Sequence, residues 1–550
     1  MVAASPSAPE VTERRPGGEP HRVQSGDAIL RAAWWILFAV VAAVVLFIRL
    51  RLLEIPLERD EGEYAYSGQL LLQGVPPYAS AYNMKLPGTY AAYAAIMAVF
   101  GQTTSGIHLG LMLVNAATVA LVFFLGKQLL DLPGATAAAG AYAVLSVSPG
   151  VLGFAGHATH FVVLPVLGAL LLLLQREPPG KRRIFVAGTL LGVGVLMKQP
   201  GIFFLPLGAI CLTVRDWRAG ATMRLMALRL SLLLGGFVLP LAATCLLLWW
   251  GGVFDKFWFW TVVYAREYGA LVPLSQAPEV FLRAIKNVIA PAWPVWAFAA
   301  VGLIACVLHR SLRTSSAALV GLLVVAALAV TPGLYFRKHY FIVALPAIAL
   351  LAGAAVAWAG TFRARITRGV ALLLVAGGFA SALYADRAFF FQLGPAAASR
   401  LIYGANPFPE AERVAAFLRD RTLPEDTIAV MGSEPEILFH ARRRSATGYI
   451  YIYSLMEAHQ HALQMQREMM AEIQAANPKY LVLVAINASW LGHANSEKLI
   501  FEWMNDYTAR HFKLVGLVDI VSNERTEYYL PASEGATATA DCSLMIYERL

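Results

Sequence analysis

Charged residues are scarce in this sequence of 550 amino acids. Asp, Glu, Lys and Arg make up 14% of it, against 58% hydrophobic residues, whereas a soluble domain carries roughly 25% charged residues. The mean hydropathy is +0.59. Between Ala32 and about Ala385, the apolar residues form blocks close to the roughly 20 residues that cross a bilayer. This excludes an ordinary soluble protein and predicts a polytopic α-helical membrane protein.

Cysteine is also rare, and the usual cofactor and nucleotide signatures are missing. Cys211, Cys245 and Cys306 lie in apolar blocks, and Cys542 is near the C-terminus, so neither a disulfide framework nor a zinc spacing is present. No GxGxxG or Walker pattern occurs in the C-terminal part. The net charge of +9 does not gather on one arm or helix, so nucleic acid is not an expected partner.

The apolar blocks predict about eleven transmembrane helices. They lie at 32–50, 106–126, 133–149, 157–175, 184–197, 201–214, 230–250, 290–308, 317–332, 340–360 and 369–385. Short basic junctions, such as Lys181-Arg182-Arg183, alternate with less basic ones and should be cytoplasmic. We expect a multi-pass protein, and the Ala- and Arg-rich composition suits a bacterial inner (cytoplasmic) membrane.

Three regions follow from this layout. Residues 1–31 would be a disordered cytoplasmic tail, residues 32–385 a transmembrane catalytic domain with a long first outer loop at 51–105, and residues 386–550 an extracytoplasmic α/β domain. In the last region, strands are predicted at Ile428–Met431, Tyr449–Tyr453, Tyr480–Ile486, Leu514–Ile520 and Ser543–Tyr547, and helices at 410–421, 457–476 and 495–511.

The first outer loop holds an unusual group of acids. It reads Glu58-Arg59-Asp60-Glu61-Gly62-Glu63-Tyr64, directly after a predicted span. Carboxylates beside a bilayer are costly to desolvate and tend to mark function. A solvated helix N-cap formed by Asp60 is an equally good interpretation when the acids are considered alone.

Later in the same loop, Lys85 is followed by Leu86-Pro87-Gly88. On its own, Lys85 would more often be a lysine reaching toward the membrane surface. An acidic and a cationic site in one outer loop would suit a reaction with an anionic leaving group, because the cation would stabilise the departing charge.

The motifs DEGEYAY, GQLLLQGVPPY and NMKLPGTYAAYA, in this order, resemble the first periplasmic loop of the GT-C superfamily of glycosyltransferases. The resemblance is to bacterial protein O-mannosyltransferase-like enzymes and to aminoarabinose transferases of lipid A. It extends through the span layout and the C-terminal domain.

This resemblance implies inverting transfer of a sugar from a polyprenyl-phosphate-linked donor to a hydroxyl of a protein, lipid or glycan acceptor. It implies that Asp60 is the catalytic base with Glu61 beside it, and that Lys85 contacts the donor phosphate. Two positions depart from the family: Leu86 replaces the first proline of Lys-Pro-Pro, and Glu63 replaces the arginine of the aminoarabinose enzymes. Tyr64 of the same motif is counted with the substrate-binding residues.

Further candidates lie at the predicted outer ends of other spans. Arg337 and His339 flank Lys338 where cations oppose the positive-inside bias, which suggests a bound anion, although simple anchoring at the interface is an equally good interpretation. The resemblance favours the bound anion, because the family often has a basic residue near this point. His157 and His160, at i and i+3, could bind acceptor, phosphate or a divalent metal, although two histidines are weak support for a metal. Lys198 could face the cavity or reach the interface. Tyr264, Arg266 and Tyr268 could line the acceptor side.

Two other functions stay open. A transporter or flippase for a lipid-linked saccharide would show internal repeats and mid-span charges, and the sequence shows neither. A non-catalytic scaffold would not need Asp60, Glu61 and Lys85. The sugar, the length of the carrier lipid and the acceptor are not determined.

Overall fold

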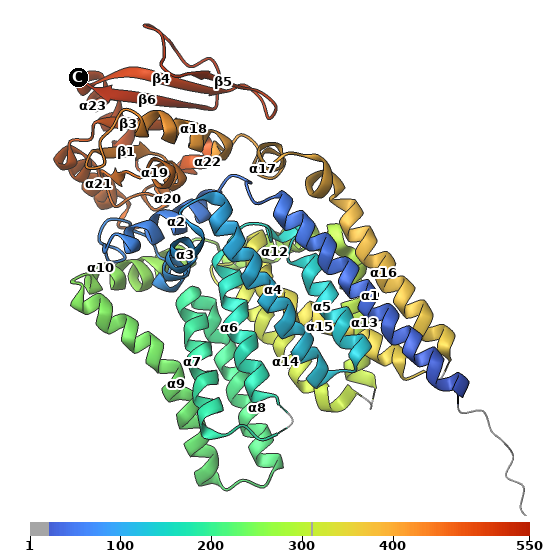
Figure 1. The fold of residues 1–550 in the computed structure, drawn as a ribbon. Coiled ribbons are helices and arrows are strands. Elements are labelled where there is room, and N and C mark those ends of the chain that lie inside the picture. The colour runs from blue at the N-terminus through green and yellow to red at the C-terminus, as the bar shows by residue number, and fades with distance from the viewer. Residues whose placement is uncertain (1–20, 176, 310–311, 363) are drawn as a thin grey trace, which may run out of the picture.

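The computed structural model describes residues 21–175, 177–309, 312–362 and 364–550, which form two parts (Figure 1). A bundle of helices contains the apolar segments. A smaller domain with a β-sheet sits at one end of the bundle, and the N-terminal end of the first helix lies at the opposite end.

The helices of the bundle follow one another with short connections. They are α1 His21–Arg51, α2 Arg59–Leu72, α3 Pro87–Phe100, α4 Thr104–Leu129, α5 Leu132–Leu145, α6 Ala158–Leu173, α7 Lys181–Met197, η2 Gln199–Phe203, α8 Phe204–Arg218, α9 Met223–Trp250, α10 Phe254–Trp258, α11 Ala265–Gly269, α12 Ala277–Ile289, α13 Trp293–Leu308, α14 Arg313–Val330, η7 Lys338–Ala344, α15 Leu345–Gly360, α16 Arg365–Ala385 and α17 Pro395–Tyr403.

Each predicted span coincides with a helix, and the chain is a polytopic helical membrane protein. Six helical segments of the described residues are long and apolar enough to cross a membrane: Ala28–Arg51, Thr104–Leu129, Met223–Trp250, Leu274–Leu308, Lys338–Gly360 and Arg365–Ala385. Shorter apolar helices lie between them, so a total of about eleven spans stays a prediction. Helix α1 already begins at His21, inside the segment expected to be disordered, and residues 1–20 lie outside the described ranges.

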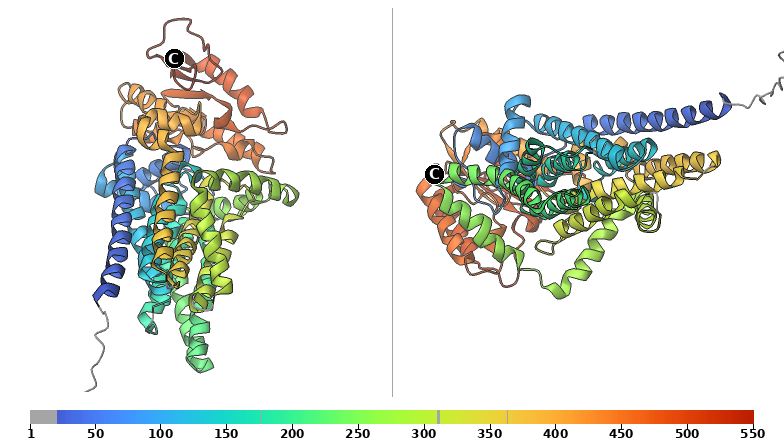
Figure 2. Two further views of the ribbon diagram at one scale, coloured as in Figure 1. Left: turned by 90° about the vertical axis from the view of Figure 1, so that its right-hand side faces the viewer. Right: turned by 90° about the horizontal axis from the view of Figure 1, so that it is seen from below.

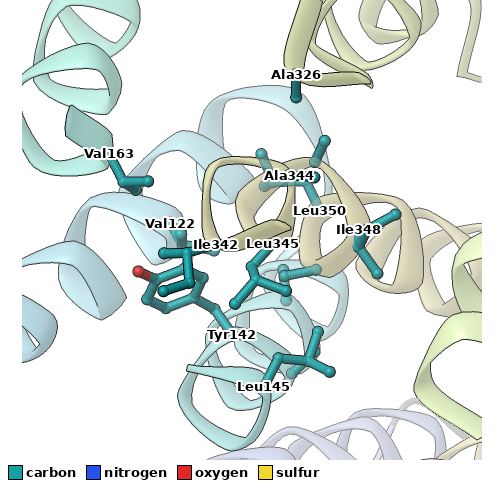
Figure 3. Packing of buried hydrophobic residues seen from close by; sticks show 14 of the residues in the cluster. Val122, Tyr142, Leu145, Val163, Ala326, Ile342, Ala344, Leu345, Ile348 and Leu350 are labelled. Atoms are coloured by element: carbon teal, nitrogen blue, oxygen red, sulfur yellow. The ribbon is translucent and has the colours of Figure 1, made fainter. Parts of the chain in front are cut away.

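Helix α15 is the centre of the bundle. In an 18-residue apolar stretch of Lys338–Gly360, 94% of the residues are buried. The corresponding share is 28% for α1 and 22% for α16, which lie at the periphery (Figure 2). Ile342 and Leu345 of this region lie beside Val122 of α4 and Tyr142 of α5 (Figure 3). Small residues bring the helices close together: a Cβ at Gly302 of α13 would lie 1.8 Å from the Leu351 carbonyl oxygen.

The predicted first outer loop contains two helices, α2 and α3, and the reason is local. Glu58 is the N-cap of α2, and it forms a reciprocal capping box with Glu61 at position N3. Pro87 begins α3 at a position where its missing N–H costs no hydrogen bond. The N-cap interpretation of Asp60 is therefore wrong, because Glu58 caps the helix and Asp60 is left in its first turn.

The C-terminal domain is an α/β structure with one mixed sheet. The strands are β1 Thr427–Met431, β2 Arg444–Ser445, β3 Tyr480–Ala485, β4 Phe512–Ile520, β5 Thr526–Tyr529 and β6 Ser543–Arg549, in the order β2-β1-β3-β6-β4-β5. The helices are α18 Phe408–Arg419, α19 Pro435–Ala441, α20 Tyr453–Met456, α21 Ala462–Ala476, α22 Asn487–Trp490 and α23 Leu499–His511. Strands β2, β1 and β3 are parallel, and β6, β4 and β5 pair antiparallel.

Four of the five predicted strands are present, and the prediction of a strand at Tyr449–Tyr453 is wrong. Residues 449–453 form bends that lead into α20. Their aromatic side chains are buried against the helical bundle instead of against a neighbouring strand: Tyr449 lies against Tyr82, and Tyr451 and Tyr453 bond to Asp60 and Arg59. Strands β2 and β5, which the sequence pattern did not indicate, are short edge strands.

One buried arginine ties the two parts together. Arg59 of α2 donates from Nε to the Ser433 carbonyl oxygen (2.6 Å), and its Nη2 lies 2.7 Å from Glu434 Oε1. Its Nη1 also donates to the Tyr453 hydroxyl (2.7 Å). The side chains of Arg59 and Glu434 are 9% and 0% exposed. Such a pair fixes geometry, because removing one partner leaves a buried charge uncompensated.

This contact predicts that Arg59→Ala loosens the C-terminal domain. The loss should be on the order of 3–5 kcal/mol, because Glu434 would be left buried and unpaired. Thermal unfolding of the purified protein, together with the rate of proteolysis between α17 and α18, measures it. Arg283→Ala is the matched control, since its pair with Glu279 leaves both side chains 75% exposed; it should change stability by less than about 1 kcal/mol. Equal effects of the two variants would contradict the prediction.

Candidate active site

A cavity lies where the bundle meets the C-terminal domain. Both parts line it. The bundle contributes α2 and the segment that follows it, the start of α6, the junction of α7 with η2, and residues near 264 and 337. The C-terminal domain contributes residues between 451 and 457. The lining includes Asp60, Tyr64, Lys85, Lys198, Tyr264, Tyr268, Arg337, His339, Tyr451, Ser454 and Glu457.

Lys85 contacts two carboxylates of α2. Its Nζ lies 2.7 Å from Asp60 Oδ1 and 2.5 Å from Glu63 Oε2. The Nζ is also 4.6 Å from the ring centroid of Tyr64. Burial alone would raise the pKa of Asp60, but the charge of Lys85 and the neighbouring histidines hold that pKa well below its usual range. Asp60 is therefore ionised at rest, and the charge of Lys85 is already matched.

The second carboxylate oxygen of Asp60 faces two stacked histidines. Oδ2 lies 3.6 Å from His157 Nδ1 and 3.9 Å from His339 Nε2. The two imidazole rings have centroids 4.1 Å apart and are tilted by 12°. One ligand atom from each of these three residues can be chosen so that all lie within 4.8 Å of one another. Within the described ranges, these residues could hold a divalent cation, since carboxylate and imidazole are common metal ligands.

Glu61 and His160 lie outside the cavity lining. Glu61 is 1% exposed, and its Oε1 accepts a hydrogen bond from the Gly156 N–H (2.5 Å) and lies 3.1 Å from His108 Nε2. Glu61 thus joins α2 to α4 and to the segment before α6. His160 follows His157 by one helical turn but is buried apart from Asp60, with no hydrogen-bond partner for its ring among the described residues.

Two further cations face the cavity. Lys198 Nζ lies 3.9 Å from the centroid of the Tyr340 ring, and Arg337 Nη2 is 3.5 Å from the Tyr268 hydroxyl. Within the described part of the chain, neither side chain has a carboxylate as an ion-pair partner. Burial lowers the pKa of Lys198 to about 7. For Lys198 the sequence allows two equal interpretations, a side chain that reaches the interface or one that faces the cavity, and the structure places the residue in the cavity lining. Lys338, between Arg337 and His339 in the sequence, is exposed.

The opposite side of the cavity comes from residues that sequence reasoning missed. Tyr451 donates to Asp60 Oδ1 (3.3 Å), and Glu457 Oε2 accepts a hydrogen bond from Tyr264 (2.5 Å). Burial raises the pKa of Glu457 to about 7. The aromatic run at 449–453 is visible in the sequence, but its alternating pattern predicts a strand. Of the three residues expected on the acceptor side, Tyr264 and Tyr268 line the cavity and Arg266 does not.

The structure therefore brings most of the predicted site residues together. Those that line one cavity are Asp60, Tyr64, Lys85, Arg337 and His339. His157 is not part of this lining, but its Nδ1 lies 3.6 Å from Asp60 Oδ2. The geometric expectation from the sequence, that an acid and a lysine of one loop meet, is confirmed by the contact between Asp60 and Lys85.

Comparisons with known proteins point to one fold. The profile of the family described as dolichyl-phosphate-mannose-protein mannosyltransferase matches residues 85–250. The chain is similar to ArnT from Cupriavidus metallidurans, both in the apo state (14% identity, TM-score 0.57) and bound to undecaprenyl phosphate (16% identity, TM-score 0.59), with 94% of this chain and 98% of that chain covered in each case.

A third similar structure is the oligosaccharyltransferase of Archaeoglobus fulgidus in the apo form, with 12% identity, a TM-score of 0.50 and coverage of 92% of this chain and 75% of that one. A comparison with curated protein sequences finds no significant match. At these identities the structural likeness concerns the fold. The chain has the GT-C fold, and it resembles the ArnT-type and protein-mannosyltransferase-type glycosyltransferases of that superfamily.

Proposed function

We propose that this protein is an inverting glycosyltransferase that moves a sugar from a polyprenyl-phosphate-linked donor to an acceptor hydroxyl. One observation carries the proposal. The ionised carboxylate of Asp60 shares a cavity with Lys198 and Arg337, two cations that have no carboxylate ion-pair partner among the described residues. A base and an anion site in one cavity are what this reaction requires.

In the proposed reaction, the acceptor oxygen attacks the anomeric carbon from the side opposite the phosphate. The bond between this carbon and the phosphate oxygen breaks, and its electron pair leaves with the polyprenyl phosphate. Asp60 takes the proton of the acceptor hydroxyl, a role worth about 10²–10⁴ in rate. No covalent intermediate forms, so the anomeric configuration is inverted.

Lys198 and Arg337 hold the phosphate in this proposal. They stabilise negative charge that develops on the leaving group in the transition state. Lys85 lies in the same cavity and can also stabilise the charge of the leaving group. Without a bound donor, Lys85 forms ion pairs with Asp60 and Glu63. The apolar residues Val162, Met197 and Val343 line the same cavity, which suits the first isoprene units of the carrier.

Glu61 and His157 act as positioning residues in the proposal. Glu61 fixes α2 against His108 and the Gly156 N–H, and His157 sets the second oxygen of Asp60. The site faces the extracytoplasmic side of a bacterial inner membrane. Supporting this, the basic turn between α8 and α9 lies at the end of the bundle far from the C-terminal domain (Figure 1).

A transporter or flippase is less well supported. Transporters keep substrate sites near the bilayer midplane, whereas this cavity lies at one end of the helical bundle, under the C-terminal domain.

The proposal predicts that Asp60→Asn lowers sugar transfer by about 10²–10⁴, because an amide cannot accept the proton of the acceptor hydroxyl. Transfer from a polyprenyl-phosphate sugar by the purified protein measures the rate, and thermal unfolding verifies the fold. Asp255→Asn changes an exposed acid of α10 outside this cavity and should retain full transfer. Undiminished transfer by a folded Asp60→Asn variant would refute the assignment.

A second prediction concerns pH. The pKa of Lys198 is lowered to about 7, so the side chain is charged below that pH and loses its charge as the pH rises through it. The donor is a phosphodiester with no titration in this range, so kcat/KM for the donor should fall between about pH 6 and 8.5, since kcat/KM reports groups of the free enzyme.

Lys198→Arg is the matched variant, because arginine stays charged across this range. It should flatten the decline in kcat/KM above pH 7, while Lys198→Met should have a low kcat/KM at every pH. If Lys198→Arg and the unmodified protein share one pH profile, then Lys198 is not the titrating contact of the phosphate.

A further inference from the structure

The segment 448–457 of the C-terminal domain covers the cavity and is held there by several contacts. The Tyr82 N–H donates to the Gly448 carbonyl oxygen (2.7 Å). The Tyr449 ring packs edge-on against Tyr82, with centroids 5.2 Å apart. Tyr451 reaches Asp60, and Arg59 donates to the Tyr453 hydroxyl. The segment is therefore fixed relative to the reaction centre.

Two polar residues of this segment line the cavity in addition to the reacting groups. Ser454 is 5% exposed, lines the cavity, and its hydroxyl has no hydrogen-bond partner among the described residues. Glu457, three residues later, also lines the cavity, and one of its oxygens accepts the Tyr264 hydrogen bond. A buried hydroxyl without a partner carries a desolvation cost unless a ligand satisfies it.

Aromatic faces complete the arrangement. Tyr264 packs edge-on against Trp260, with centroids 5.2 Å apart, and Tyr268 stacks on Tyr335. Trp260, Tyr264 and Tyr268 all line the cavity together with Ser454 and Glu457. Hydroxyl and carboxylate groups beside aromatic faces can bind a ligand that is apolar on its ring faces and polar at its edges. A sugar ring has this character.

We propose that Ser454, Glu457 and Tyr264 form the subsite that recognises the hydroxyl groups of the transferred sugar. The inference rests on the proposed function, and it assigns sugar specificity to the C-terminal domain. Glu457 and Ser454 accept or donate hydrogen bonds to ring hydroxyls, while Tyr264 holds the carboxylate of Glu457 in place.

Binding measurements separate the sugar from the phosphate. The full-length protein in nanodiscs is titrated with undecaprenyl phosphate alone and with undecaprenyl-phosphate hexoses. The unmodified protein should bind at least one hexose donor more tightly than the bare phosphate. Glu457→Gln and Ser454→Ala should weaken binding of that hexose donor by about tenfold, the effect of one well-made hydrogen bond, without changing the affinity for undecaprenyl phosphate.

Glu468→Gln is the matched control. Glu468 also accepts a tyrosine hydrogen bond, from Tyr449 (2.6 Å), but it does not line the cavity, so its replacement should leave binding of every donor unchanged. The subsite is overturned if Glu457→Gln and Ser454→Ala bind all donors like the unmodified protein, or if they lose the bare phosphate equally. Failure of the proposed function has another signature: the unmodified protein would transfer no sugar from any donor.

Discussion

The contact between Asp60 and Lys85 is the constraint on which the site depends. Two opposite charges 2.7 Å apart, on side chains that are 21% and 14% exposed, attract more strongly than they would in water. The contact keeps Asp60 ionised despite its burial, and it holds the segment after α2 against that helix. A base that is too strongly paired is a weak base, however. In the proposed reaction, the donor phosphate competes for Lys85 and so releases basicity in Asp60 only when the donor is bound.

The fold places this pair through local features of α2. The capping box of Glu58 and Glu61 starts α2 shortly after the end of α1, and it places Asp60 in the first turn of α2. Glu61 then anchors the turn to His108, and Arg59 anchors it to the C-terminal domain. Three neighbouring residues therefore point in three directions, to the cavity, to the bundle and to the domain. A dense run of charges in a sequence can serve packing and chemistry at once.

This division explains which parts of the site the sequence could reveal. Asp60 and Lys85 lie in one continuous loop with a family-like motif, so their meeting was predictable. The different role of Glu61 was not, because its partners, His108 and the Gly156 N–H, are remote in the chain. The span layout followed from hydropathy alone, while the two helices inside the first loop required attention to the capping pattern and to Pro87.

The error at 449–453 has a single physical cause. Alternation and aromatic content report that a segment is buried, but they do not say against what. Tyr449, Tyr451 and Tyr453 are turned toward the bundle, so their burial comes from the contact between the two parts of the protein. Short edge strands such as β2 were missed for the opposite reason. Their residues are only partly buried, and the pairing is made by backbone groups that leave little trace in the side chains.

The cavity thus combines two kinds of recognition from two parts of the chain. The bundle provides Lys198, Arg337 and the apolar lining, which suit a carrier that is the same for many sugars. The C-terminal domain provides Ser454 and Glu457, whose hydrogen bonds depend on the positions of hydroxyl groups. Since backbone contacts at Gly448 and the buried Arg59 fix the segment, its cavity-facing side chains can change without moving the base. Under the proposed function, sugar specificity could therefore change through this segment while the binding of the carrier phosphate is retained.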